Sequence, residues 1–321
     1  MLNYHKIKSL IVNLFLLLIV TFFSLLICEF AVRKILPFSL KQDERNLSYN
    51  HHQTLGWFPK PNLQQKFIGS QEITVSHNNQ GFRDANNHPN SPALMFLGDS
   101  FVWGYDVENE KIFTSLLQKK LQQQYAIYNL GVSGYGTGQE FLLLQQFYDK
   151  IKPQKVFLIF CANDYYDNRN NVVYGGYYKP YFLQNNAGEL LLQGVPVPIS
   201  GNYKMLNFAS NHPVLAKSHV VQWLAKLFYR AQHNLAKKRS LPDPTWAILK
   251  NINQFLQAKN TQFIVGIIDS DDDLEKFLKQ QNITFINLKN DFRFPQQGNH
   301  WNRQGHEFVA DKIFNWLNKN K

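Results

Sequence analysis

The chain has 321 residues, of which 44% are hydrophobic, and its formal net charge is +11. Its two cysteines, Cys28 in an apolar run and Cys161 at the end of a predicted strand, exclude a disulfide framework and a cysteine metal cluster. The densest basic stretch, residues 237–239, ends a helix predicted from Ser218, where cations favour the helix dipole. No zinc finger, aromatic RNA-binding signature or long basic run accompanies it. We therefore expect no nucleic-acid partner, and we expect attraction to anionic lipid or polysaccharide instead.

The first predicted element is a transmembrane helix over residues 9–28, after a short tail of residues 1–8. This run carries no formal charge, and at about 1.5 Å per residue it can cross a hydrocarbon layer about 30 Å thick. A cleaved secretory signal is the alternative, but its apolar core normally has about 7 to 15 residues and a small-x-small site follows it. No such site follows here, which favours an uncleaved anchor. Basic residues on both sides of the run leave its orientation open.

Residues 29–90 are rich in Asn, Gln and His and predict a stalk with small strands, such as one at Glu72–Val75. The segment Asn78–Asp84, which contains Gly81-Phe82-Arg83, predicts a turn before the main domain. That domain is expected over residues 91–321.

Within residues 91–321, short apolar runs alternate with longer helical stretches, a pattern typical of parallel strands with crossover helices. We expect an α/β domain with an open five-stranded parallel sheet of order 2-1-3-4-5. The predicted strands cover residues 93–97, 126–130, 156–160, 263–268 and 284–287. Helices are predicted from a cap at Asn109, over residues 139–148, 244–257 and 272–280, and from Asn302 onward.

An insertion of about residues 165–243 separates the third and fourth strands. It is crowded with tyrosines, and Pro180–Pro198 predicts a hairpin around Asn186-Ala187-Gly188. Loops of this kind usually shape a substrate site, and tyrosines can stack on sugar rings.

Candidate functional residues lie at the carboxyl ends of the first three strands. In a sheet of this order, the crevice opens between the first and third strands. Ser100 and Asn163 follow these two strands, and Gly134 follows the second. Acyl transfer needs a nucleophile, a base and donors for the oxyanion. We expect Ser100 to attack, His300 to accept its proton, and the backbone amides of Ser100 and Gly134 with the Asn163 side chain to hold the oxyanion.

These motifs resemble those of the SGNH hydrolases, also called GDSL-type esterases. The likeness covers about Ser76–Asn318. It rests on Gly98-Asp99-Ser100-Phe101, Asn129-Leu130-Gly131-Val132-Ser133-Gly134, Asn163-Asp164, and His300 with Gly305-His306. The resemblance implies a flavodoxin-like three-layer fold and catalysis without a metal or organic cofactor. The chain looks particularly like membrane-anchored members of the bacterial envelope, with a Glu29-Arg33 pair after the helix, which implies an extracytoplasmic catalytic domain on the periplasmic face of the inner membrane.

Two positions depart from the family pattern. Cys161 stands where the third block usually opens with glycine, and Gln297 and Gly298 stand where an aspartate usually precedes the histidine. An aspartate normally orients the histidine and stabilises its charged form. Gln297 could orient the ring without supplying charge, Asp291 could fold back, or the site could be a Ser-His dyad.

The leading hypothesis is a membrane-anchored esterase or deacylase acting on an acylated carbohydrate or lipid through a Ser-His acyl-enzyme mechanism. One alternative is O-acyl transfer to an envelope polysaccharide, in which a sugar hydroxyl replaces water. Another is a non-catalytic carbohydrate-binding protein that kept the fold after losing the acid. The sequence leaves the oligomeric state open.

Overall fold

The computed structural model divides the chain into two compact units, each treated separately below. One unit comprises residues 1–42 and 201–237, and the other comprises residues 43–200 and 238–321. The structure describes residues 4–35, 48–173, 176–201, 203–204, 212, 214–235, 241–296 and 298–320.

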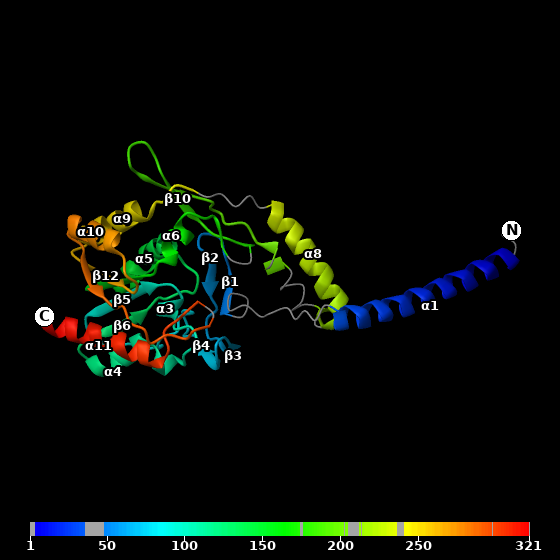
Figure 1. The fold of residues 1–321 in the computed structure, drawn as a ribbon, viewed down its shortest axis with the longest axis horizontal. Coiled ribbons are helices and arrows are strands. Elements are labelled where there is room, and N and C mark those ends of the chain that lie inside the picture. Colours follow the sequence, from blue (N-terminus) through cyan, green and yellow to red (C-terminus); the bar gives the residue numbers. More distant parts are fainter. Residues whose placement is uncertain are drawn as a thin grey trace. The chain divides into compact units, whose positions relative to one another are not determined.

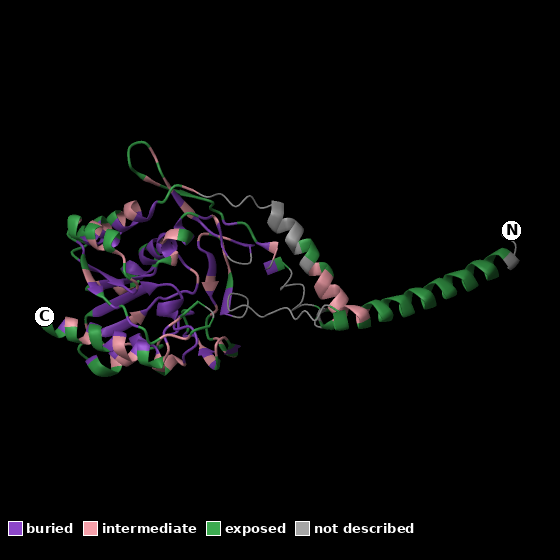
Figure 2. Cartoon of the chain, in the orientation of Figure 1, coloured by how far each residue is buried: buried purple, intermediate pink, exposed green. Residues whose placement is uncertain are grey.

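The larger unit is built on a five-stranded parallel sheet (Figure 1). In sheet order its strands are β6 (Ala126–Asn129), β5 (Ala93–Gly98), β7 (Lys155–Phe160), β12 (Gln262–Ile267) and β13 (Thr284–Asn287). This arrangement confirms the predicted order 2-1-3-4-5. Strand β5 is buried along its whole length, which explains why its sequence is a continuous apolar run (Figure 2).

Helices cover both faces of the sheet and make it the middle of three layers (Figure 1). The main helices are α4 (Phe113–Leu121), α5 (Thr137–Ile151), α9 (Thr245–Gln257), α10 (Asp272–Gln280) and α11 (Arg303–Lys319). α4 packs against α11 on one face, and α5 packs against α9 on the other. Buried apolar side chains of α4 and α11, including Leu117 and Ile313, form one core cluster with the sheet.

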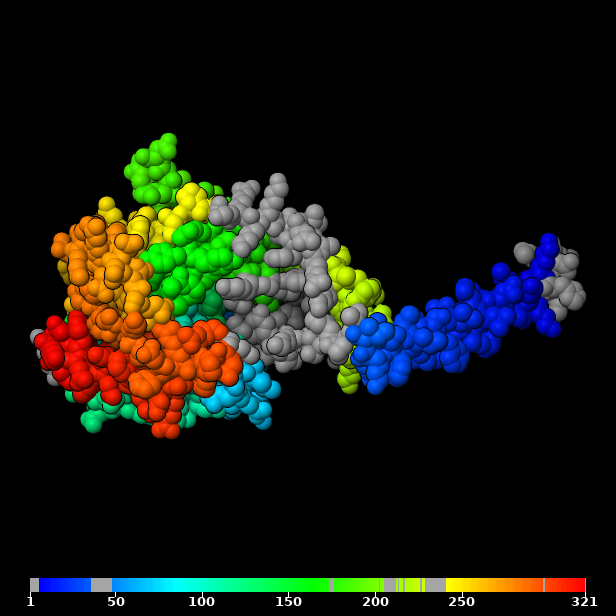
Figure 3. Space-filling view, viewed as in Figure 1, coloured from blue at the N-terminus to red at the C-terminus, as the bar shows by residue number. Residues whose placement is uncertain are grey.

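Short helices and hairpins complete the larger unit. The helices are α3 (Ser100–Trp103), η1 (Asn109–Lys111) and α6 (Asn163–Asn168). The antiparallel pairs are β1 (Tyr49–His52) with β2 (Gly56–Pro59), β3 (Gln64–Ile68) with β4 (Glu72–Ser76), β8 (Val172–Val173) with β9 (Tyr177–Tyr178), and β10 (Tyr181–Gln184) with β11 (Leu190–Gln193). The β10–β11 pair is the hairpin predicted around residues 186–188, and it projects from this unit (Figure 3).

The β1–β2 hairpin is not a free stalk, in contrast to the expectation for residues 29–90. Trp57 is fully buried, and its indole nitrogen donates to the Ser133 carbonyl at 3.1 Å. The Tyr49 hydroxyl accepts a hydrogen bond from the Ser133 amide at 3.1 Å. The hairpin therefore belongs to the same packed body as the sheet.

Asn109 is not the cap of α4, in contrast to the prediction. It lies in η1, and the N-cap of α4 is Ile112. The Asn109 Oδ1 accepts from Arg83 Nε at 2.9 Å, and its Nδ2 donates to the Ser76 carbonyl at 2.7 Å. The asparagine joins two distant segments instead of starting a helix.

Arg83, in the predicted turn Asn78–Asp84, is a fully buried arginine whose guanidinium holds the loop after α3. It donates to the carbonyls of Gly104 at 2.5 Å and Val107 at 2.7 Å, in addition to its bond with Asn109. Burial lowers the pKa of Arg83 to about 10, so the group keeps its charge at neutral pH.

Replacing Arg83 with methionine is expected to lower the free energy of unfolding by about 3 to 5 kcal/mol, because several carbonyls lose a charged donor while staying buried. The midpoint of urea denaturation measures this loss. Arg83→Lys, which keeps the charge but not the planar fork, should lose less. Equal stability of the methionine variant and the wild type would contradict this role.

Asp84 is a second ionisable group of this segment, and most of its side chain is shielded from solvent. Its carboxylate accepts from the Asn129 amide at 3.1 Å and lies 3.5 Å from Nε2 of His88. Burial raises the pKa of Asp84 to about 7. Between its ordinary value of about 4 and this value, the folded chain holds a proton that the unfolded chain releases, so Asp84 makes folding less favourable as pH rises through this range.

In the Asp84→Asn variant, the fall in stability between about pH 4 and pH 7 is expected to shrink by on the order of 2 kcal/mol relative to the wild type. Urea denaturation at a series of pH values measures the difference. Asp149→Asn, at an exposed carboxylate, is the control and should leave the pH dependence unchanged. An identical pH profile for the Asp84 variant and the wild type would refute the argument.

The smaller unit contains α1 (Tyr4–Ile35), η3 (Leu215–Lys217) and α8 (His219–Leu235). Within α1, residues Lys6–Ile35 are long and apolar enough to cross a membrane, and the most apolar window has a mean hydropathy of 2.9. A helix of this kind at the N-terminus is a membrane anchor or a signal sequence. It contains the whole predicted segment 9–28 and extends beyond it at both ends.

Candidate active site

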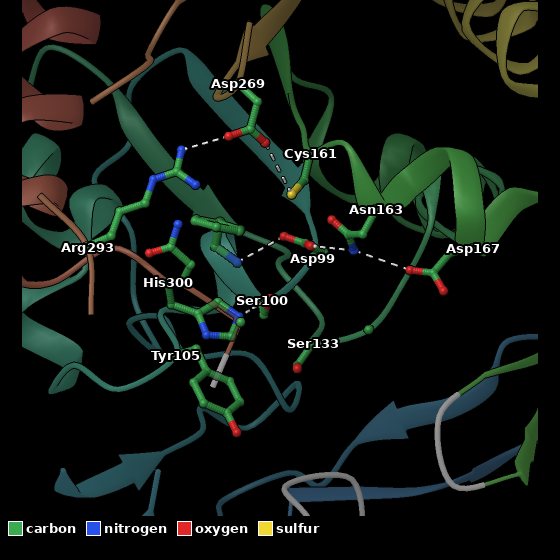
Figure 4. Close-up of a pocket in the computed structure, with 14 residues that line it drawn as sticks. Asp99, Ser100, Tyr105, Ser133, Cys161, Asn163, Asp167, Asp269, Arg293 and His300 are labelled. Atoms are coloured by element: carbon green, nitrogen blue, oxygen red, sulfur yellow. Dashed lines mark hydrogen bonds and ion pairs between the residues drawn. The ribbon is translucent and has the colours of Figure 1, made fainter. Parts of the chain in front are cut away.

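Ser100 and His300 lie 200 positions apart in the chain and meet in the fold (Figure 4). His300 Nε2 is 2.7 Å from Ser100 Oγ. Ser100 follows β5 and begins α3, where the Asp99 carboxylate accepts from the Phe101 amide at 2.9 Å and caps the helix. This is the contact that a nucleophilic hydroxyl and its general base require.

A tight chain reversal between residues 292 and 302 positions His300. The Phe294 amide donates to the His300 carbonyl at 2.8 Å, and Arg293 and Trp301 form an antiparallel bridge. Trp301 is fully buried, which holds the strand that carries the histidine. Asn302 then caps α11 by accepting from the Gly305 amide at 3.1 Å, and this helix begins where the last helix was predicted to start.

Tyr105 stacks on the imidazole of His300. The two ring centroids are 4.2 Å apart and the planes meet at 21° (Figure 4). Tyr105 is itself 9% exposed and packs edge-on against Phe67, with the centroids 5.2 Å apart. The aromatic face limits rotation of the imidazole. Sequence reasoning missed Tyr105, because nothing in its neighbourhood signals contact with a residue near the C-terminus.

Tyr105→Leu is expected to lower kcat/KM for an activated ester about tenfold, because the stacked ring is lost while the hydroxyl–imidazole pair stays. Tyr105→Phe keeps the ring and should stay close to the wild-type rate. Steady-state kinetics with p-nitrophenyl acetate measures both. A leucine variant as fast as the phenylalanine variant would show that stacking does not position His300.

Asn163 begins α6 and joins two carboxylates beside the cavity. Its Nδ2 donates to Asp99 Oδ2 at 3.1 Å and to Asp167 Oδ2 at 3.2 Å (Figure 4). These two bonds account for both N–H groups of the amide. One of them must be exchanged before Asn163 can donate to an oxyanion. The oxyanion role of Asn163 therefore stays a prediction, and it requires this exchange.

Gly134 lines the same cavity as Ser100 and Asn163. Its φ of +77° lies in the left-handed region, where glycine is favoured. The loop after β6 therefore contributes backbone to the site at a position that suits glycine.

The cavity that these residues share has a volume of about 500 Å³. Its lining residues are Asp99, Ser100, Phe101, Tyr105, Ser133, Gly134, Cys161, Asn163, Asp167, Asp269, Arg293, Gly298, Asn299 and His300. The loops after β5, β6, β7 and β12 thus converge with the segment that carries His300 (Figure 4).

The model of the GDSL-like Lipase/Acylhydrolase family matches residues 96–308, about two thirds of the chain, from within β5 to within α11. The chain belongs to this family. No curated protein matches the sequence. This GDSL-type hydrolase is therefore an esterase or acylhydrolase by family.

Solved structures of similar fold include esterase EstA from Pseudoalteromonas sp., with 14% identity, a TM-score of 0.41, and coverage of 71% of this chain and 97% of that one. A catalytic mutant of an acetylxylan esterase from Geobacillus stearothermophilus has 11% identity and a TM-score of 0.41, with coverage of 72% and 95%. A G-D-S-L lipolytic protein from Veillonella parvula has 14% identity and a TM-score of 0.40, with coverage of 71% and 98%.

Asp291, one of the predicted partners for the second nitrogen of His300, is not brought to the cavity of this GDSL-type hydrolase. Asp291 is exposed and is not among the lining residues, and its backbone carbonyl accepts from the Arg293 amide at 2.9 Å. Gln297 lies outside the described residues. The choice between a dyad and a substituted acid therefore stays open.

An ion pair that sequence reasoning missed lies at the cavity. Arg293 Nη2 is 2.9 Å from Asp269 Oδ1, and the same nitrogen donates to the Ile268 carbonyl at 2.8 Å. Asp269 stands directly after the predicted strand 263–268, so the strand-end signal that identified Asn163 was available for Asp269 as well.

Cys161 is buried at the cavity, where the family usually has glycine. Its Sγ lies 3.9 Å from Asp269 Oδ2. Burial, together with nearby carboxylates, raises the pKa of the Cys161 thiol well above its usual value. The thiol is therefore protonated and is not a competing nucleophile at neutral pH.

Acidic side chains are buried behind the cavity together with Lys179. Burial raises the pKa of Asp99 to about 6 and those of Glu140 and Asp164 well above their ordinary values. Lys179 Nζ donates to the Asp167 carbonyl at 2.7 Å. Burial thus favours neutral carboxyls in this cluster, which limits its charge. Among the described residues, no group of three or more His, Cys, Asp or Glu side chains is arranged to hold a metal ion.

Proposed function

We propose that this GDSL-type hydrolase is a membrane-anchored serine esterase that removes acyl groups from a carbohydrate or lipid outside the cytoplasm. The observation that carries the proposal is the 2.7 Å contact between His300 Nε2 and Ser100 Oγ at a cavity of about 500 Å³. The apolar length of α1 supports the anchor.

The reaction proceeds in two steps, acylation and deacylation, and each passes through a tetrahedral intermediate. Ser100 Oγ attacks the ester carbonyl carbon while His300 Nε2 takes the hydroxyl proton. The oxyanion accepts hydrogen bonds from the backbone amides of Ser100 and Gly134 and from Asn163. When the intermediate collapses, the alcohol leaves with the proton from His300. Water then attacks the acyl carbon and gives a proton to His300. The second intermediate collapses to the carboxylic acid, and His300 returns the proton to Ser100 Oγ.

Labelling with a fluorophosphonate tests the nucleophile directly. The full chain in detergent is treated with the probe, and mass spectrometry of its peptides locates the added group, which should sit on Ser100. The Ser133→Ala variant, which removes another serine of the cavity, should label fully. A folded chain that never labels at Ser100 would contradict an enzyme and support a carbohydrate-binding protein.

Acyl transfer to a polysaccharide is the second candidate, because a cavity of about 500 Å³ has room for an acceptor as well as an acyl group. The two functions share the acyl-enzyme and differ in the group that attacks it. Chromatography and mass spectrometry of the products, with an acetylated donor and an oligosaccharide acceptor, separate them. Free acetate alone supports hydrolysis, whereas acetylated acceptor supports transfer.

A further inference from the structure

The smaller unit joins the N-terminal helix to a helix of the insertion. The Glu29 carboxylate on α1 accepts from Ser218 Oγ at 2.8 Å, from the His219 amide at 2.8 Å and from the Val220 amide at 3.0 Å. It also pairs with Arg33 at 3.3 Å. Glu29 therefore caps α8 from outside, and the cap satisfies donors that a helix start leaves free.

α8 presents bulky apolar side chains to its surroundings. Leu224 is 52% exposed, Leu227 is 43% exposed and Phe228 is 67% exposed. These residues recur at helical spacing and lie on one face, while the sequence places Gln222, Lys226 and Arg230 on the opposite face. Exposed apolar rows with a polar opposite face mark an interaction surface.

The charge around α8 identifies the partner that this face fits. Residues 201–242 contain seven lysines and arginines and no aspartate or glutamate. An amphipathic helix with one apolar face and basic residues on the other is the form that binds in the plane of an anionic bilayer. The start of α8 is tied to the part of α1 where charged residues first appear after the apolar run, which is the expected level of the membrane surface.

We propose that α8 is an interfacial helix whose apolar face, with Leu224 and Phe228, inserts into the surface of an anionic bilayer beside α1. The inference rests on the proposed anchoring by α1. It gives α8, which is part of the insertion, a role in lipid binding. The sequence alone predicts that the insertion shapes the substrate site instead. Residues 201–237 are connected along the chain to the larger unit at both ends. Their contact with lipid would therefore attach the protein to the membrane at a second point, in addition to α1.

Fluorescence quenching of the full chain in vesicles of phosphatidylcholine and phosphatidylglycerol tests this proposal. An environment-sensitive fluorophore is attached in a Cys28→Ser background at Phe228→Cys or, as the matched control on the polar face, at Gln222→Cys. We expect the iodide quenching constant to be several times smaller at 228 than at 222, and brominated lipid to quench 228 more strongly. Removing phosphatidylglycerol or introducing Glu29→Gln should raise iodide quenching at 228. The background variant without an added cysteine measures any labelling of buried Cys161.

A third probe at Leu17→Cys, in the middle of α1, separates the two proposals. If 17 is shielded from iodide while 228 and 222 are quenched equally, the interfacial helix is wrong and the anchor stands. If 17 and 228 are both quenched as freely as 222, both proposals fail. Hydrolysis of p-nitrophenyl acetate at the wild-type rate verifies that the larger unit is intact in each variant.

Discussion

Replacing Ser100 with alanine is expected to lower kcat/KM for p-nitrophenyl acetate by about 10⁴-fold or more, because it removes the hydroxyl that contacts His300 Nε2. Replacing His300 with glutamine should cost a similar factor, since the hydroxyl then loses the base at 2.7 Å. The double variant should be no slower than either single one, because the pair acts as a unit.

Ser133→Ala is the matched control for this experiment. Ser133 lines the same cavity, and its backbone bonds with Tyr49 and Trp57 do not depend on its side chain. Its alanine variant should keep wild-type kinetics. Loss of activity in Ser133→Ala together with full activity in Ser100→Ala would overturn the assignment of the nucleophile. Circular dichroism and urea denaturation establish that all the variants are folded.

Asn163→Ala is expected to lower kcat about 10²- to 10³-fold with little change in KM, because an oxyanion donor acts in the transition state rather than in the bound ester. The same variant leaves Asp99 and Asp167 without the amide that joins them, so stability must be measured beside the kinetics.

Asp167→Asn separates the two effects of Asn163. This variant disturbs the contact with Asn163 Nδ2 but leaves the amide donor in place, and it should slow the enzyme by about tenfold at most. Asn163→Asp, which replaces the donors by acceptors, should be as slow as the alanine variant. Equal kcat for Asn163→Ala and the wild type would exclude the side chain from the oxyanion site.

The parallel sheet could be predicted because each of its strands and helices can be recognised from its own residues. The strand expected at 284–287 and the helix expected at 272–280 match β13 and α10 in both bounds. The helix α11 begins near Asn302 as expected, and Asn302 is its cap, a role that suits a short polar side chain before a helical pattern. Buried strands such as β7 stand out as continuous apolar runs for the same reason.

Contacts between distant segments could not be predicted in this way. Asn109 has the sequence of a helix cap, but Arg83 and Ser76 take its side chain. Residues 29–90 are rich in Asn, Gln and His, although Trp57 among them is fully buried. In each case the partner lies far along the chain, so local composition carries no signal of it.

The residues of the active site fall into the same two groups, those that the local sequence identifies and those that contacts between distant segments place. Ser100, Gly134 and Asn163 could be identified because each follows a strand, and topology brings strand ends together. Tyr105 and Arg293 reach the cavity from loops whose paths depend on tertiary packing. The strand-end rule would have found Asp269 had it been applied to β12.

The hydrogen bonds of Trp57 and Tyr49 with the Ser133 backbone have a practical consequence for preparing a soluble enzyme. A truncation that removes everything before the first sheet strand would remove the contacts that support the loop bearing Gly134. Loss of turnover in such a shortened chain would then result from the missing contacts rather than from the absence of lipid. A shortened chain that begins upstream of Ser48 would keep these contacts.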